Sequence, residues 1–507
     1  MGHAHPNWHG HSAWCQSPDS IEASFDPLAF LRAWHAWQQD PQRPAHLHVL
    51  AHMAQPITPE ELPNVESELQ PLALALAAQC WGLLPGIHRL RFEQGHVCLT
   101  LCVGAHADWP EFTALLQRHP TGPCLAPPLP DERHVVVIGS GVAGAGTARA
   151  LAERGWQVTV LDAGEAPASG ASGLPVGVVA PHTSHDDSGV SRLSRAGLRH
   201  MEQTMRTLLV DGQDWAATGV RERRLPGKTR RGGVPLSWKH EHAQAAQDWT
   251  RPAPPPAPDD AYWHPRGAWL RPAQLVRALL NHPHIHWQGS ARVTGLVHHH
   301  GQWQVMQDVQ VLAHAPRVVI AAGPGSVALA DLVSQQHHLP IKPLRGQISW
   351  GLMADVPHAP MPATPVNGHG SLVHSIATPE GPAWFAGSTF DRIHTEPVLL
   401  DADHQQNLER LQVLEPATGQ ALQAAFEQGH VRGWAGMRCG VYDRLPVVGA
   451  VPHAPEGIYI NAAMGSRGLT LGLLCGELLA AQWHGEPLPI EARLAKYLDA
   501  GRFVPKP

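Results

Sequence analysis

The sequence predicts an α/β fold built around a Rossmann-type dinucleotide-binding domain, and three observations support this prediction. A short apolar strand runs into a GxGxxG loop and an alanine-rich helix within residues 134–155. A second strand, glycine-rich turn and helix occupy residues 457–482. Two proline-rich stretches, 120–130 and 252–258, are unsuited to helices or central strands and predict a linker and an exposed loop.

Composition narrows the class of protein. The 507 residues suffice for about two to four domains with their own cores. A net charge of −6 excludes a basic coat over the whole surface. Seven cysteines without a CxxC pair favour a reducing compartment over a disulfide framework. With no secretory h-region and no apolar run of roughly 18 residues or more, we expect a cytoplasmic protein without a membrane span.

The N-terminal segment predicts a small α/β piece without a catalytic cluster. Apolar residues recur at helical spacing over 27–38 and 69–84. Residues 88–92 and 96–103 predict the two strands of a hairpin, with Gln94–Gly95 as its turn. A histidine-rich start can chelate a metal, but a polar tail is the favoured interpretation, so no metal site is predicted. These histidines are His3, His5, His9 and His11.

The dinucleotide fingerprint begins at residue 134. A strand over 134–138 precedes a loop and a helix over 145–154, and a second strand over 157–161 ends on Asp162. The loop consists of Gly139, Ser140, Gly141, Val142, Ala143 and Gly144. Strand, loop, helix, second strand and acid together make the motif strong, whereas GxGxxG alone is weak.

Each part of the fingerprint has a physical role. Gly139 permits the tight turn, Gly141 lets the backbone approach a pyrophosphate, and Gly144 lets the helix pack on the strand. The helix N-terminus offers N–H groups to phosphates. Asp162 would accept hydrogen bonds from ribose hydroxyls.

The continuation of the chain favours FAD over NAD. Small residues after Asp162 would let the backbone pass close to a cofactor, and a further buried strand over 317–323 ends on Gly323. The C-terminal turn again aims N–H groups at a ligand. A cofactor contacted at both ends of a single large domain suggests FAD. The residues concerned are Ala171, Ser172, Gly173, Gly323, Gly465, Ser466, Arg467, Gly468 and Leu469.

Three segments carry a family resemblance. They are HVVVIGSGVAGAGTARALAERGWQVTVLDAGEAPASGASG, WAGMRCGVYDRLPVVGAVP and AAMGSRGLTLGLLCGELLAAQ. Together they resemble the FAD-dependent oxidoreductase half of the MnmC family of bifunctional tRNA 5-methylaminomethyl-2-thiouridine biosynthesis proteins, within the D-amino-acid-oxidase/glycine-oxidase superfamily. The resemblance implies an enzyme that oxidatively removes the carboxymethyl group, as glyoxylate, from 5-carboxymethylaminomethyl-(2-thio)uridine at the tRNA wobble position, leaving the aminomethyl group.

The resemblance also implies a domain organisation. Residues 134–503 form the oxidoreductase domain, with FAD-binding parts at 134–200, 315–335 and 430–485 and an inserted α+β substrate domain at 201–314 and 336–429. Residues 1–119 resemble fragments of the methyltransferase half, and 120–133 are the linker. Ser24–Pro27 replaces the family's glycine-rich loop, and the acidic segment after the last strand is missing. We therefore expect a degenerate remnant without methyltransferase activity; an unrelated cap domain is the alternative.

The substrate group is an N-substituted glycine, whose carboxylate is best held by a bidentate arginine. The resemblance places that role on Arg438. Arg467, on the C-terminal turn, could face flavin carbonyl oxygens or the same carboxylate. For both arginines the alternative is a structural ion pair. Cys439 offers a covalent attachment point, but the family is expected to hold FAD non-covalently.

A tRNA substrate predicts a local basic surface, and residues 221–239 contain seven basic residues against one glutamate. The proposed tRNA-binding residues are Arg221, Arg223, Arg224, Lys228, Arg230 and Arg231. A solvated charged loop is the alternative. Two other functions stay open: an oxidase of a free small amine such as glycine or sarcosine, and a non-catalytic flavin- or RNA-binding protein. No oligomeric state is predicted.

Overall fold

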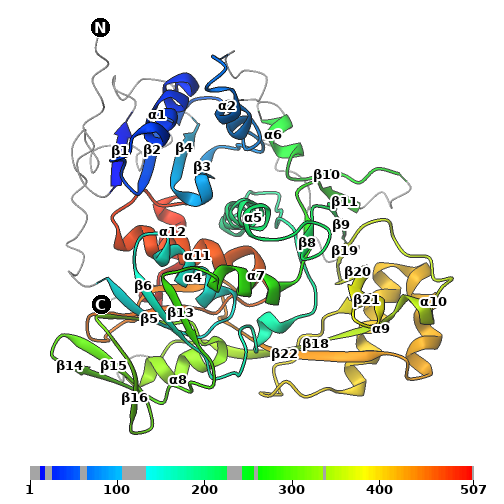
Figure 1. Ribbon diagram of the computed structural model, residues 1–507. Helices are drawn as coiled ribbons and strands as arrows, with labels where there is room; N and C mark the ends of the chain where they lie inside the picture. The colour runs from blue at the N-terminus through cyan, green and yellow to red at the C-terminus, as the bar shows by residue number, and fades with distance from the viewer. Residues whose placement is uncertain are drawn as a thin grey trace. The chain divides into compact units, whose positions relative to one another are not determined.

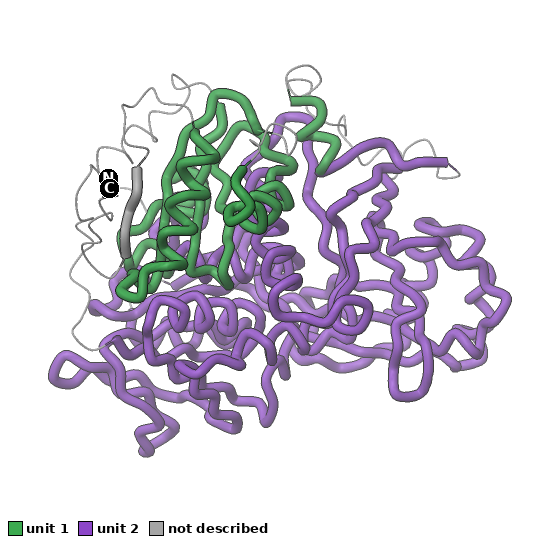
Figure 2. Tube along the Cα trace, turned by 45° about the horizontal axis from the view of Figure 1, so that its top comes forward, with its two compact units in different colours: residues 1–131, 240–248, 480–495 green, residues 132–239, 249–479, 496–507 purple. Residues whose placement is uncertain are grey.

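The structure is a computed structural model (Figure 1) that describes residues 25–57, 65–104, 133–224, 242–255, 261–334 and 338–504, and the backbone of 12–16. The chain divides into two compact units (Figure 2). The first comprises residues 1–131, 240–248 and 480–495, and the second 132–239, 249–479 and 496–507. Within the described ranges, no helix has the length and apolarity that a membrane crossing requires.

The first unit contains a four-stranded sheet of order β1-β2-β4-β3. Three strands run parallel, namely β1 (Ser12–Gln16), β2 (His46–Met53) and β4 (Val97–Val103), and β3 (Gly86–Phe92) is antiparallel at the edge. Side chains from α1 (Pro27–Gln39) and α2 (Gln70–Ala77) share one core with β2, β3 and β4. The unit also includes α6 (Ala243–Gln247).

Local sequence explains these elements. Asp26 caps α1 by accepting hydrogen bonds from the backbone N–H groups of Leu28 and Ala29 at 2.9 and 3.2 Å. The predicted hairpin is confirmed, and Gln94 in its turn has a φ of 55°. The second predicted helix is shorter than its apolar pattern, because the chain turns after Ala77 and Gly82 adopts a φ of 57°.

The second unit is built on a six-stranded sheet of order β13-β6-β5-β17-β24-β23. All neighbouring pairs run parallel except β23 with β24. The strands are β5 (His134–Ile138), β6 (Gln157–Leu161), β13 (Ile285–Gln288), β17 (Arg317–Ile320), β23 (Val447–Ala450) and β24 (Ile458–Ala462). The strand order reverses between β5 and β17, where open α/β sheets bind ligands.

Helices pack on this sheet through small residues. Contacts join α4 (Val142–Ala152) to four of the strands and to α7 (Pro272–Leu280). Glycines let α11 (Gly468–Trp483) approach α4 closely, since a Cβ atom on Gly146 would lie 2.7 Å from Leu473. The three-stranded sheet β14-β15-β16 shares a core with β5 and β17. Its strands are β14 (Gly295–His299), β15 (Gln302–Gln307) and β16 (Gln310–Ala315).

A second large sheet has eight strands in the order β10-β11-β9-β19-β20-β21-β18-β22. They are β9 (Val220–Arg223), β10 (Arg251–Pro252), β11 (Ala261–His264), β18 (Lys342–Leu352), β19 (Val366–Gly368), β20 (Gly370–Thr378), β21 (Gly381–Gly387) and β22 (Arg432–Gly440). Helices α9 (Asp401–Leu414) and α10 (Pro416–Glu427) share a core with it. The predicted α/β class with an inserted α+β part is confirmed.

The remaining elements complete the frame of the second unit. A small sheet contains β7 (Gly177–Val179), β8 (Trp215–Ala216) and β12 (Ala268–Leu270). The helices are α5 (Gly189–Leu208) and α8 (Ser326–Asp331), and α12 (Ala492–Leu498) extends from the first unit into the second. The first helix of the fingerprint begins at Val142, three residues earlier than predicted, because Gly141 is already its N-cap.

Candidate active site

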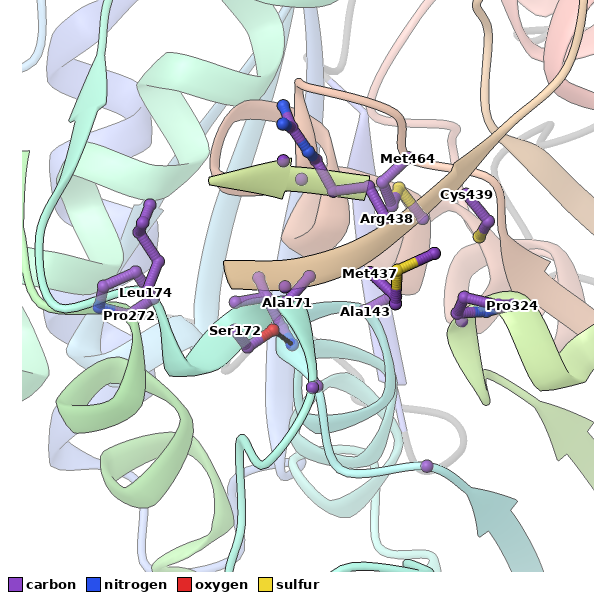
Figure 3. Close-up of a pocket in the computed structure, with 18 of the residues that line it drawn as sticks. Ala143, Ala171, Ser172, Leu174, Pro272, Pro324, Met437, Arg438, Cys439 and Met464 are labelled. Atoms are coloured by element: carbon purple, nitrogen blue, oxygen red, sulfur yellow. Dashed lines mark hydrogen bonds between the residues drawn. The ribbon is translucent and has the colours of Figure 1, made fainter. Parts of the chain in front are cut away.

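A cavity of about 1050 Å³ lies at the switch point of the second unit (Figure 3). Its walls come from the loops that follow β5, β6, β17 and β24 and from the faces of β18, β21 and β22. This volume is at the upper end of ligand pockets, which span roughly 300–1000 Å³. The cavity therefore has room for a large cofactor together with a substrate group.

The GxGxxG loop forms one wall. Gly139 and Gly141 line the cavity, and a Cβ atom on Gly141 would have only Ser172 Oγ close to it, at 3.1 Å. Gly144 instead faces inward, where a Cβ atom would stand 1.9 Å from the carbonyl oxygen of Gly139. Val142 and Ala143 line the cavity at the start of α4, whose N-terminal N–H groups favour an anion. Ser140 is buried outside the lining.

Asp162 lines the cavity at the end of β6. One of its carboxylate oxygens accepts hydrogen bonds from the backbone N and Oγ of Ser140, at 2.6 and 2.7 Å. The other accepts from the backbone N of Gly164 at 2.8 Å. These bonds tie the acid to the phosphate-binding loop, and a carboxylate has further lone pairs for ribose hydroxyls.

Glycines from several loops form a cradle that fits FAD. Cβ atoms on Gly170, Gly323 and Gly465 would meet nothing within 4 Å, and all three residues line the cavity. The cradle thus leaves the backbone open to a long, flat ligand. Ala171, Ser172, Ser466, Gly468 and Leu469 also line it. Gly173 does not, because its Cβ position faces the carbonyl oxygen of Ala168 at 2.9 Å.

Arg438 projects from β22 and lines the cavity (Figure 3). Its Nη2 donates hydrogen bonds to Ser388 Oγ at 3.1 Å and to the carbonyl oxygen of Thr389 at 3.0 Å. Within the described part of the chain, no carboxylate forms an ion pair with it. Its guanidinium lies 4.6 Å from the ring centroid of Phe390, which also lines the cavity.

The environment of Arg438 makes this cation a receptor for an anion. Burial lowers its pKa to about 10, and repulsion from Arg410 contributes to the same shift. The side chain is still protonated at neutral pH. A partly buried cation without a carboxylate partner is unfavourable until an anion neutralises it. A substrate carboxylate in the cavity would do so.

Arg467 is not part of the cavity lining, although its neighbours Ser466 and Gly468 are. Burial lowers its pKa, and the positive charge of Arg444 lowers it further. Its charge also contributes to lowering the pKa of His182, after burial. Arg467 is therefore near enough to His182 and Arg444 for its charge to act on theirs, and unlike Arg438 it does not line the cavity.

Cys439 lines the cavity beside Arg438, and burial raises its pKa to about 11. The group is thus a neutral thiol at physiological pH, which is a poor nucleophile. This agrees with the expectation that FAD is held non-covalently.

Three of the predicted tRNA-binding arginines have partners inside the second unit. Arg221 pairs with Glu415 at 2.6 Å, and Arg223 donates to the carbonyl oxygen of Leu414 at 2.8 Å. Arg224 pairs with Glu222 at 3.0 Å and also donates to Thr183. The other three, Lys228, Arg230 and Arg231, lie outside the described residues.

Sequence reasoning missed several cavity residues. Arg292 and Thr294 follow β13, Ser388 and Phe390 follow β21, and Trp434 lies on β22. Trp434 begins one of the three segments that carry the family resemblance, and the other four residues belong to no recognised motif. The signal that could have found Arg292 and Thr294 is their position, since they lie in the loop after β13, the third parallel strand along the chain.

Comparison with known proteins agrees with this geometry. The family described as FAD dependent oxidoreductase matches residues 134–482. A tRNA 5-methylaminomethyl-2-thiouridine biosynthesis bifunctional protein MnmC from Polaromonas naphthalenivorans is 41% identical, with 97% of this chain and 91% of that protein aligned. The MnmC protein of Paracidovorax citrulli is 42% identical, with 98% and 93% aligned.

Solved structures share the fold. Glycine oxidase from Geobacillus kaustophilus superposes with a TM-score of 0.54 at 19% identity, covering 71% of this chain and 98% of that one. L-proline dehydrogenase from P. horikoshii gives 0.57 at 17% identity, covering 74% and 98%. The predicted FAD cofactor and the class of oxidoreductase acting on CH–NH groups are thereby confirmed. The chain thus belongs to the FAD dependent oxidoreductase family and, within it, to the MnmC family.

Proposed function

We propose that this protein oxidatively removes the carboxymethyl group, as glyoxylate, from 5-carboxymethylaminomethyl-(2-thio)uridine at the wobble position of tRNA. FAD, when bound, supplies the two-electron oxidation of the CH–NH unit. The oxidised carbon–nitrogen bond then hydrolyses in water to glyoxylate and the aminomethyl nucleoside. A tRNA substrate also implies that the protein acts in the cytoplasm.

The observation that carries the proposal is the guanidinium of Arg438 in the cavity, which has no carboxylate partner among the described residues. The atom to be oxidised is bonded directly to the substrate carboxylate. An arginine that fixes the carboxylate therefore also fixes the reacting carbon, which lowers the entropic part of the barrier. Its charge offsets the cost of removing the carboxylate from water.

A free small amine is the second candidate substrate. Arg438 would hold the carboxylate of glycine or sarcosine in the same way. The identity with MnmC proteins over nearly the whole chain favours the tRNA substrate. The basic residues Lys228, Arg230 and Arg231 favour it as well, since a free amino acid needs no such charge.

We further propose that the N-terminal unit does not transfer methyl groups. The alignment with the Polaromonas protein extends over 588 positions, more than the 507 residues of this chain, so this chain lacks residues that the relative has within the aligned region. Among the described residues of this unit the sheet has four strands, fewer than a full doubly wound methyltransferase sheet would have. The start of α1 carries Asp26 as its N-cap and Pro27 as its first residue in place of a glycine loop.

One reaction series tests both proposals. Purified protein is incubated with tRNA from a strain that lacks this gene, and the wobble nucleosides are analysed by mass spectrometry. We expect loss of the carboxymethyl group and one glyoxylate per nucleoside. Adding S-adenosylmethionine should leave the aminomethyl product unmethylated. Turnover of glycine or sarcosine without change in the tRNA would overturn the tRNA proposal, and a methylated product would overturn the second one.

A further inference from the structure

Phe390 is a large aromatic side chain that lines the cavity while 52% of its surface stays exposed. Folding normally buries such a ring, so an aromatic left open at a cavity indicates a ligand contact. Resting on the function proposed above, we propose that Phe390 stacks on the uracil base of the wobble nucleoside while Arg438 holds the carboxylate.

The backbone around Phe390 is held firmly. Thr389 donates its N–H to the carbonyl oxygen of Gln347 at 3.0 Å. Asp391 and Arg345 exchange two backbone hydrogen bonds, at 3.0 and 2.8 Å. These bonds fix the segment on both sides of the ring to β18, so the ring has a defined place at the cavity.

Phe390 and Arg438 lie close enough together for one nucleoside to contact both. The guanidinium of Arg438 is 4.6 Å from the ring centroid of Phe390. In the substrate, four bonds separate the uracil ring from the carboxylate carbon, an extended reach of about 5 Å for bonds of ~1.5 Å. A carboxylate bound by Arg438 therefore brings the base within reach of the Phe390 ring.

A second cation supports the ring. Arg410 lies 5.9 Å from the same centroid and donates a hydrogen bond to the carbonyl oxygen of Ser388. Phe390 nevertheless keeps about half of its surface exposed. Single-stranded bases are recognised by stacking on aromatic side chains and arginine planes, which matches this surface. Ile393 on the same segment is 85% exposed and does not line the cavity, so it offers a matched control.

The test compares Phe390→Ala, Phe390→Trp and Ile393→Ala on two substrates. One is an anticodon stem-loop with the modified uridine, and the other is N-ethylglycine, which has the carboxymethylamine but no base. Glyoxylate release gives kcat and KM, and flavin absorbance verifies the fold. We expect Phe390→Ala to lower kcat/KM on the stem-loop by about 10- to 100-fold, mainly through KM, and by less than about threefold on N-ethylglycine. Phe390→Trp should keep most of the activity, and Ile393→Ala should equal the wild type on both.

Each other outcome has a definite meaning. Equal losses on both substrates would overturn stacking and make Phe390 part of the carboxylate site. Unchanged kinetics on the stem-loop would also overturn it. A wild-type protein that releases glyoxylate from N-ethylglycine but from no tRNA would overturn the proposed function itself, and stacking with it.

Discussion

The side chain of Arg438 lies across Gly346 of β18: a Cβ atom added to Gly346 would stand 1.7 Å from Nη2 of Arg438. The two residues occupy neighbouring antiparallel strands, since Gly346 pairs with Gly436 on β22. The absence of a side chain on β18 thus creates the space in which the guanidinium reaches Ser388 and the cavity. Positioning of the proposed carboxylate receptor depends on a residue outside every recognised motif.

Replacing Gly346 by alanine should therefore displace Arg438 and lower kcat/KM by about tenfold or more, because a charge-assisted hydrogen bond loses its alignment. FAD content should stay near the wild-type value. Gly440→Ala, at the far end of β22, is the control, since a Cβ atom there would make only an ordinary contact, at 3.6 Å, with the Cα atom of Gly465. Wild-type kinetics for Gly346→Ala would show that Arg438 does not need this position.

Replacing Arg438 by alanine should lower kcat/KM by about 10- to 100-fold with FAD binding nearly intact, because hydrogen bonds to charged groups contribute about 1.5–3 kcal/mol. Lysine should restore only part of the activity, since an ammonium lacks the planar fork. Glyoxylate release from modified tRNA is the measurement. Full activity of Arg438→Ala would move the carboxylate receptor to another residue.

Replacing Gly141 by valine should abolish FAD binding. Its Cβ position meets only Ser172 Oγ and otherwise opens into the cavity, so branched methyl groups would occupy the place of the pyrophosphate. Flavin absorbance of the purified variant, with circular dichroism as the check on folding, measures this. A folded variant with a full complement of FAD would contradict the assignment of the loop.

Glu222 gives a prediction for acid stability. Burial raises its pKa, but the hydrogen bond and charge of His264 and the pairing with Arg224 outweigh burial and bring the pKa to about 2. Because the folded pKa is depressed, this stabilisation is present above the unfolded pKa of about 4.3 and is lost as pH falls toward 2. Glu222→Gln should therefore cost on the order of 2–3 kcal/mol at pH 7 and much less near pH 3.

Urea unfolding at both pH values measures that difference. The exposed pair of Glu380 with Arg432 provides the control, since Glu380→Gln should change the unfolding free energy little at either pH. If Glu222→Gln lowered the unfolding free energy equally at both pH values, the charge of the carboxylate would not be the source of the stabilisation.

Substitutions in the basic run at 221–239 should have two different kinds of effect, one on tRNA binding and one on fold stability. Charge reversal at Lys228, Arg230 and Arg231 together should weaken tRNA binding and lower the slope of log affinity against log salt by roughly 2. Arg221→Glu should instead destabilise the fold, because it places a like charge against Glu415 at 2.6 Å. Filter binding over a salt series and thermal unfolding distinguish them. An unchanged salt slope for the triple variant would remove this run from the tRNA site.

The nucleotide-binding half of the fold could be predicted because its signals are local. The strand, glycine loop, helix and acid of residues 134–162 lie within one stretch of chain, and backbone sterics restrict where glycine is needed. The eight-stranded sheet could not be predicted from local sequence. Its strand β22 pairs with β18, about 90 residues earlier in the chain, and the residue pattern of a strand does not identify the strand with which it pairs.

The sequence by itself determined the strand, glycine loop, helix and acid of a dinucleotide-binding fingerprint, found in the structure as β5, α4 and Asp162, and through its family resemblance that the cofactor is FAD. The tertiary structure alone decided which cation faces the cavity. Arg438 and Arg467 are the same residue type, yet the missing side chain of Gly346 leaves space in which Arg438 lines the cavity, whereas Arg467 does not line it. Side-chain direction depends on neighbours brought from distant parts of the chain, and a linear sequence does not record them.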